Sequence, residues 1–123
     1  MIGSEGTTRV RDTSTAGRTT RIRILNDALR CYAHSGIMCL TSGVQALGEQ
    51  GVEEVLLAVR AFDEFTNDND PHAEHDFGAV WAAGARIFWK IDYYDQELRS
   101  GSPDPSDPAV TTRVLTIMLA SEY

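Results

Sequence analysis

Cysteine, long apolar stretches and an apolar N-terminus are all scarce or missing in this chain of 123 residues. Its two cysteines, Cys31 and Cys39, are too few for a disulfide framework, so we expect buried, reduced thiols. No apolar run approaches the ~20 residues that span a bilayer, and residues 1–21 lack the hydrophobic core of a secretory signal. The sequence therefore predicts a single cytoplasmic domain that does not enter a membrane.

Basic side chains are scarce beyond the N-terminal quarter. Residues 31–123 carry five Lys and Arg against fifteen Asp and Glu, a balance of −10 within a net charge of −7. A domain of this sign repels phosphate backbones, so we expect no direct binding of nucleic acid. The acidity suits a partner protein with a basic surface, such as one that itself binds nucleic acid, although it also serves solubility alone.

The N-terminal part changes character near Thr20. Residues 1–19 contain mostly Thr, Ser, Gly and Arg, which predicts a flexible tail before one domain at 20–123. An amphipathic helix follows, with Thr19 or Thr20 as its expected cap and Ser35-Gly36 at its expected end. Its apolar positions, three and four residues apart, are Ile22, Leu25, Leu29 and Tyr32.

Short apolar segments come next along the chain. Residues 37–41 predict a buried strand between glycines, and 44–47 predict one helical turn. The segment 52–65 fits a helix or a strand. We favour a strand over 55–62, because the hairpin that follows needs a neighbouring strand.

The C-terminal half reads mainly as strands. Residues 77–83 and 86–94 predict a β-hairpin around Gly84-Ala85, where glycine supplies the positive φ of a tight turn. Three prolines make 101–108 a loop, and 113–123 predict a further strand, with a terminal helix as the alternative. The expected fold class is α+β: an N-terminal amphipathic helix packed on a mostly antiparallel sheet of about four to five strands.

Residues 67–78, NDNDPHAEHDFG, gather side chains that bind divalent metals or carry protons. A helical turn here would bring His72, His75 and Asp76 to one side as metal ligands. Glu74 and His75 are then the candidate catalytic groups of a metal-dependent hydrolase or nuclease. The spacing matches neither an EF-hand nor a zinc-protease helix, and the composition is also typical of a solvated turn. A second possible ligand set, interrupted by a glycine, is Cys31, His34 and Cys39.

Aromatic side chains cluster in the second strand of the predicted hairpin. Trp89 and Ile91 share one face, which predicts core, whereas Phe88 and Tyr94 point to the other face. Exposed beside Asp92, these two rings would form an amphipathic patch suited to a partner. A helix packed on that face would bury them instead.

Six stretches of the sequence stand out together: RIRILNDALR (21–30), LTSGVQAL (40–47), NDPHAEHDFG (69–78), FWKIDYYD (88–95), GSPDPSDP (101–108) and TRVLTIMLASEY (112–123). They resemble a family of small proteins of unknown function, found mostly in alphaproteobacteria and often on plasmids and other mobile elements. The resemblance covers about residues 20–123 and implies no activity, cofactor or catalytic residue. It implies an accessory role, because small acidic proteins of mobile elements include inhibitors of host defence.

Three functions follow as hypotheses. The first is a non-enzymatic protein-binding accessory protein of a mobile element, including an anti-defence (anti-CRISPR or anti-restriction) inhibitor, whose acidic loops at 63–76 and 92–107 bind a basic partner. The second is the metal-dependent hydrolase or nuclease, and the third is a small structural or regulatory domain. The first needs no cofactor, the second needs a divalent metal, and none sets the oligomeric state. The expected partner-binding residues are Asp68, Asp70, Glu74, Asp76, Phe88, Asp92, Tyr94 and Asp95.

Overall fold

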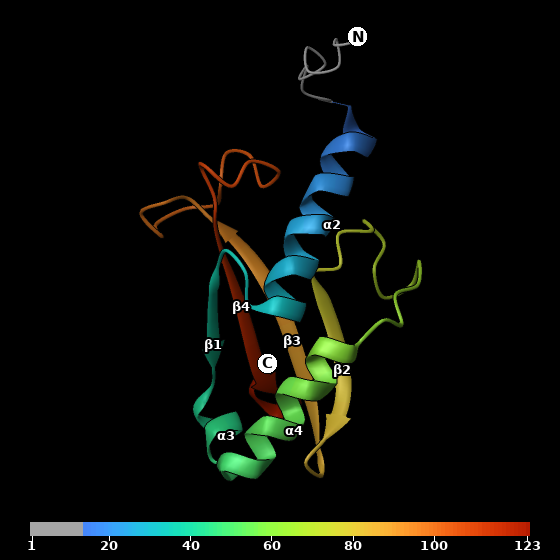
Figure 1. Cartoon of the computed structure of the whole chain (residues 1–123), viewed down its shortest axis with the longest axis vertical. Helices are drawn as coiled ribbons and strands as arrows, with labels where there is room; N and C mark the ends of the chain where they lie inside the picture. Colours follow the sequence, from blue (N-terminus) through green and yellow to red (C-terminus); the bar gives the residue numbers. More distant parts are fainter. Residues whose placement is uncertain (1–13) are drawn as a thin grey trace, which may run out of the picture.

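A computed structural model describes residues 14–123, which form two long helices and a four-stranded sheet (Figure 1). The predicted α+β class, with a helix near the N-terminus, is confirmed. The elements in chain order are α2 (Thr15–Tyr32), β1 (Ile37–Leu40), α3 (Ser42–Gln45), α4 (Gly48–Ala61), β2 (Phe77–Ala82), β3 (Ala85–Tyr94), β4 (Thr112–Leu119) and the 3₁₀ turn η1 (Ala120–Glu122).

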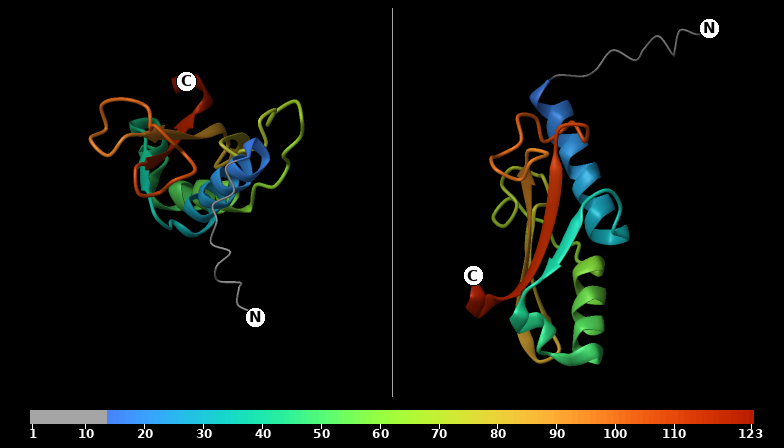
Figure 2. Two further views of the ribbon diagram at one scale, coloured as in Figure 1. Left: turned by 90° about the horizontal axis from the view of Figure 1, so that it is seen from above. Right: turned by 90° about the vertical axis from the view of Figure 1, so that its left-hand side faces the viewer.

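The sheet has the strand order β1-β4-β3-β2, so β1 and β2 are its edges. Strand β3 pairs antiparallel with both β2 and β4, whereas β1 pairs parallel with β4. Both long helices, α2 and α4, lie on one face of the sheet (Figure 2). No long helix of residues 14–123 covers the opposite face, which we call the open face.

Helix α2 begins earlier than the sequence predicts. The side-chain oxygen of Ser14 accepts a hydrogen bond from the backbone N–H of Gly17 at 3.0 Å, so Ser14 is the N-cap rather than Thr19 or Thr20. Residues 15–19, assigned to the tail from sequence, are therefore helical, and residues 1–13 of the predicted tail lie outside the described residues.

The end of α2 also differs from the prediction. Ala33 takes a left-handed conformation with φ of 54°, and its N–H bonds back to the carbonyls of Ala28 and Leu29. The helix therefore stops before Ser35-Gly36. In the predicted apolar stripe Leu29 is buried, whereas Tyr32 in the last turn is exposed.

The segment predicted as a strand over 55–62 is helical, and that prediction is wrong. Residues 55–61 form the second half of α4, where Val55 and Val59 are fully buried one turn apart. The hairpin needed a neighbour, as expected, but β4 supplies it from more distant sequence.

The hairpin of β2 and β3 turns one residue earlier than predicted. Ala83 and Gly84 both have positive φ, 55° and 74°, as a two-residue type I′ turn requires. Ala83 adopts the left-handed conformation despite its Cβ. The prediction placed the turn one residue too late because it took glycine as the residue that begins the positive-φ turn.

Strand β1 is an exposed edge strand, and the prediction of a buried strand is wrong. Ile37, Met38 and Cys39 are all exposed, because within residues 14–123 β1 has only β4 as a strand neighbour. The expectation of two buried thiols fails for the same reason: Cys39 is exposed and Cys31 is half-buried.

The core lies between the sheet and the two long helices. The strands contribute fully buried side chains to this core at the alternating positions that a sheet imposes: Trp89 from β3, and Leu115 and Ile117 from β4. The strand predicted near the C-terminus is thereby confirmed as β4. In the part of the chain that is described, no helix combines the length and apolarity needed to cross a membrane.

Candidate functional site

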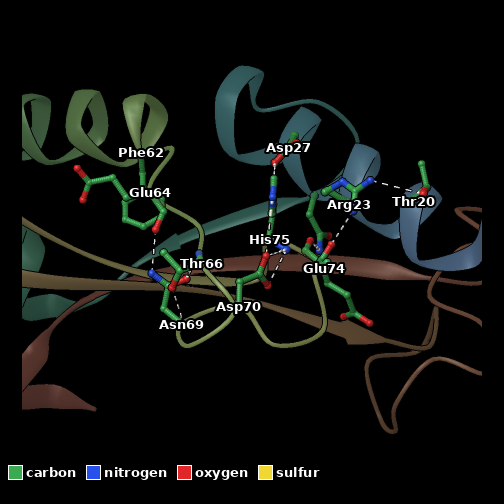
Figure 3. A network of polar contacts seen from close by, with 12 residues as sticks. Thr20, Arg23, Asp27, Phe62, Glu64, Thr66, Asn69, Asp70, Glu74 and His75 are labelled. Carbon is green, nitrogen blue, oxygen red and sulfur yellow. Dashed lines mark hydrogen bonds and ion pairs between the residues drawn. The ribbon is translucent and has the colours of Figure 1, made fainter. Parts of the chain in front are cut away.

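The predicted acid and histidine segment is a series of turns between α4 and β2, packed against α2 (Figure 3). At its start Thr66 N donates to Asn69 Oδ1 at 2.8 Å, and Asn69 N donates to Thr66 Oγ1 at 3.2 Å. Asn69 Nδ2 also donates to the carbonyl of Glu64 at 2.8 Å. These side-chain to backbone contacts are those of a structured turn.

His75 is held between this loop and α2. Its Nδ1 lies 2.9 Å from Asp27 Oδ1, whereas its Nε2 lies 3.8 Å from Asp70 Oδ2, too far for a hydrogen bond (Figure 3). The ring stacks on Phe65 with the centroids 3.6 Å apart and the planes 5° from parallel. With φ of 56°, the His75 backbone is left-handed and unfavourable outside glycine, so these contacts hold the residue in place.

Asp70 closes the loop on itself. Its side chain is buried, and its two carboxylate oxygens lie 3.2 and 3.3 Å from the backbone N–H of His75, which donates to them. Its own N–H donates to the carbonyl of Thr66 at 2.8 Å. A buried carboxylate satisfied by nearby backbone fixes a loop and is not available to a partner.

A polar network centred on Asn26 ties the end of the loop to the core. Asn26 is 0% exposed; its Nδ2 donates to the carbonyl of Glu74 at 3.0 Å and to Tyr93 Oη at 2.8 Å. Its Oδ1 accepts from Arg113 Nε at 2.8 Å, and Tyr93 Oη donates to Glu74 Oε1 at 2.8 Å. The loop, α2, β3 and β4 therefore meet at one buried amide.

Arg30 joins α2 to the end of α4. Its Nη1 donates to the carbonyls of Val59 and Phe62, each at 2.9 Å, so it caps the end of α4. Its Nη2 lies 3.2 Å from Asp27 Oδ1, the oxygen that also contacts His75. The guanidinium lies over the Trp89 ring, with 5.1 Å to its centroid.

Burial shifts the proton affinities of three side chains in this region. Burial first, and then the charge of Glu74, raises the pKa of Asp76 above its ordinary value of 3.8. Burial also raises the pKa of the Tyr93 phenol well above its ordinary range and lowers the pKa of Arg113. Tyr93 is therefore a neutral hydrogen-bond donor to Glu74 at all physiological pH values.

The structure gathers only part of the predicted metal and catalytic set. His75 and Asp76 are half-buried neighbours, His72 is exposed, and the Glu74 carboxylate accepts a bond from Tyr93. Among residues 14–123, no three His, Cys, Asp or Glu side chains are grouped closely enough to hold a metal ion. That statement includes the second possible set, Cys31, His34 and Cys39. The arrangement acts as an anchor: the titratable groups are joined to α2 and to the loop backbone.

Three of the predicted partner-binding residues lie on the open face. Phe88, Asp92 and Tyr94 occupy alternate positions of β3, opposite to buried Trp89. Asp92 lies 2.7 Å from Lys90 Nζ, and this hydrogen bond raises the pKa of Lys90. No long helix of residues 14–123 covers the two rings, and both are half-buried.

The other predicted partner-binding residues lie in loops and differ in accessibility. Asp68 is exposed, and Asp76 is half-buried. Asp95 accepts a bond from the backbone N–H of Arg99 at 3.0 Å, which stabilises its own turn. Asp70 and Glu74 are engaged within the chain, as described above.

Sequence reasoning missed the residues that hold the loop from a distance, among them Asn26, Asp27 and Arg113. One signal was present in the sequence. Asn26 falls four residues after Ile22, within the stripe of α2 that faces the core, and a polar side chain there requires buried partners.

The chain belongs to a protein family whose description is Protein of unknown function (DUF3768), which matches residues 40–122. The resemblance stated from the sequence is thereby confirmed as far as an uncharacterised family. Comparison with curated proteins and comparison with solved structures gave no match.

Proposed function

We propose that this chain is a cytoplasmic, non-enzymatic protein-binding protein whose acidic and aromatic surface binds a partner protein with a basic surface. The open face of the sheet carries the proposal. Trp81 and Tyr123 are each 74% exposed, and the half-buried rings of Phe77 and Phe88 lie 6.0 and 5.5 Å from the Tyr123 ring. Exposed aromatic surface of this kind marks binding sites more often than free surface.

The acidic part of the surface supports the proposal that the partner is basic. Exposed carboxylates follow one another along α4 and the segment after it, and none forms an ion pair with a described residue. Uncompensated negative charge attracts a basic surface and speeds its encounter. These residues are Glu49, Glu53, Glu54, Asp63, Glu64 and Asp68.

A host defence complex that binds nucleic acid presents such a basic surface. An anti-defence inhibitor carried by a mobile element, acting against CRISPR or restriction machinery, is therefore the specific form of binding protein that we propose. The proposal rests on charge and on the exposed aromatic face, together with the resemblance described above.

Affinity capture from a bacterial extract, followed by titration of the purified captured protein, tests the binding function. A double variant, Asp92→Lys with Tyr94→Ala, reverses charge and removes a ring on the open face. Ile24→Ser is the matched control, because Ile24 is 60% exposed but lies on α2, behind the opposite face. We expect the wild type and Ile24→Ser to retain the same basic protein, with affinity falling as salt rises, and the double variant to lose it. Equal retention by all three proteins contradicts the proposal.

The hydrolase or nuclease hypothesis has less support from the geometry. A histidine between two carboxylates is an arrangement that carries protons in enzymes. Here, however, His75 Nδ1 contacts Asp27, and the Asp70 carboxylate accepts a hydrogen bond from the loop backbone. Melting the protein with EDTA and then with Mg²⁺, Mn²⁺, Ca²⁺ or Zn²⁺ tests it. A saturating ion would raise the melting temperature by several degrees, and His75→Ala would abolish that rise.

A further inference from the structure

Strand β2 is a free edge of the sheet with outward-facing backbone groups. Ile91 N donates to Asp76 O at 2.9 Å, and β2 and β3 continue in the same register. Hydrogen-bonded pairs alternate along an antiparallel ladder, so the backbone N–H and C=O groups of Gly78 and Val80 point toward β3. The three residues whose N–H and C=O point away from β3 are Phe77, Ala79 and Trp81, and no other segment within 14–123 pairs with them.

A groove runs beside this edge, between β2 and the end of α4, elements that lie next to each other in Figure 1. It consists of two adjoining hollows of about 350 and 330 Å³. Both hollows are lined by Phe62, Glu64 and Ala79, so they join at the middle of β2. One extends toward Trp81 and the other toward Phe77, and together they follow the length of the strand.

The groove has small residues where a second strand needs room. Gly78 and Ala79 of β2 and Ala58 and Ala61 of α4 contribute little side-chain volume to its walls. Phe62 supplies an apolar wall that could contact alternate side chains of an added strand. Added strands gain affinity from main-chain hydrogen bonds and specificity from such side-chain contacts.

Edge strands are normally protected against pairing with other chains. Short length, Lys or Pro residues, and bulges serve this purpose. Strand β2, with the sequence FGAVWA, has none of these residues and is six residues long, whereas the other edge, β1, has four. An unprotected edge beside a groove is the geometry that strand addition uses.

The charge at the groove identifies the occupant. Asp63 and Glu64 line it, both are exposed, and neither forms an ion pair with a described residue, while Arg86 is the only basic residue in the lining. A second copy of this chain would bring the same two acids toward their equivalents, which is unfavourable. A basic segment complements them.

We propose that β2 is a docking edge to which an extended, basic segment of the partner protein adds as a fifth strand. Its Lys or Arg residues contact Asp63 and Glu64, and its alternate apolar residues enter the groove. This inference rests on the proposed function, because it states how the basic partner binds. The added strand also extends the open face beyond Trp81.

The probe for a first test is a blocked octapeptide that alternates Lys with Val, titrated into the isotopically labelled full chain. We expect the amides of Phe77, Ala79 and Trp81 to gain protection from hydrogen exchange, and those of Gly78 and Val80 to change little. Binding should weaken as salt rises. Two matched peptides, one with Glu in place of Lys and one N-methylated along one edge, should bind at least about tenfold more weakly. Equal binding by the N-methylated peptide overturns strand addition without any change to the protein.

Two variants test the same edge from the protein side. Ala79→Pro removes an outward N–H, and proline is tolerated at such edge positions; Glu64→Lys reverses a groove charge. Each should weaken peptide binding about tenfold or more, whereas Leu57→Ser, an exposed position of α4 outside the groove lining, should not. Melting curves verify folding of every variant.

The outcomes separate this inference from the proposed function. If the captured partner binds Ala79→Pro as tightly as the wild type, strand addition is wrong and the binding function stands. If the wild type captures no partner, the binding function itself fails. A dimer of the wild-type chain that Ala79→Pro dissociates would show that a second copy occupies the edge, and it overturns the inference of a basic partner segment.

Discussion

Replacing Asn26 with alanine tests whether the polar network behind the loop holds the domain together. The amide makes hydrogen bonds of 3.0, 2.8 and 2.8 Å to Glu74, Tyr93 and Arg113, and it is fully buried. Each lost neutral bond costs about 1 kcal/mol, and a buried cationic donor left without a partner costs roughly 1–3 kcal/mol more. Asn26→Ala should therefore lower the free energy of unfolding by about 3–5 kcal/mol.

That loss is a large share of the roughly 5–15 kcal/mol by which a domain is stable, and it should lower Tm by on the order of 10–20 °C. Urea unfolding followed by the fluorescence of Trp89, which is fully buried, measures it. Arg23→Ala is the control, because Arg23 Nη1 donates to Ala73 O of the same loop at 3.0 Å, but this hydrogen bond is exposed to solvent. We expect the control to cost less than about 1 kcal/mol.

Equal costs for Asn26→Ala and Arg23→Ala would refute the reasoning, since burial would then make no difference to the bond. A double-mutant cycle with Tyr93→Phe sharpens the test. Tyr93 bonds both Asn26 and Glu74, so the two substitutions should be less than additive. Additive effects would show that the network does not act as a unit.

Three further predictions concern packing and pH. Gly78→Ala places a Cβ 2.5 Å from Trp89 Nε1, and since the indole is buried, calorimetry should show a destabilisation of about 1–3 kcal/mol; an unchanged Tm would contradict it. Asp76→Asn should stabilise the protein at pH 7, because burial raises the pKa of Asp76 and so disfavours its charged form. This gain in stability should shrink as pH falls through the raised pKa toward the ordinary 3.8. A gain in stability that does not depend on pH would point to another cause. Hydrogen bonds from Thr41 and from the N–H groups of Leu119 and Gly43 lower the pKa of Glu122 below 4.5. The contribution of Glu122 to stability is therefore present above that value and is lost as pH falls through the lowered pKa. Glu122→Gln should remove this acid-dependent step in Tm, and persistence of the step would refute the assignment.

Local patterns were sufficient to predict some elements and not others. The period of α2 and the alternation of β3 and β4 depend on neighbouring residues, and the sequence predicted all three. The segment of α4 fits either period, and the choice of strand assumed that the hairpin found its neighbour nearby. Burial of β1 was overestimated because its place at the edge depends on β4, which follows much later in the chain.

The site shows the same division. The turn residues Thr66 and Asn69 act on each other within the loop, as their sequence suggests. His75, in contrast, depends on Asp27 of α2, and Asn26 depends on Arg113 of β4. No pattern within the loop indicates these distant partners. The acids and histidines of the loop were therefore interpreted as available metal ligands, whereas several of them bond to other parts of the chain.

The place of β4 has a consequence for how the chain folds. Among the strands of residues 14–123, β4 is synthesised last, yet it lies between β1 and β3, and its register pairs Ile37 with Val114 across roughly 77 residues. A nascent chain can form α2, α4 and the β2–β3 hairpin early, because their contacts are local. Until β4 arrives, the inner edge of β3 and the whole of β1 have no strand partner. We therefore expect insertion of β4 to limit the folding rate, and the interval before it to be the stage at which the chain aggregates or requires a chaperone.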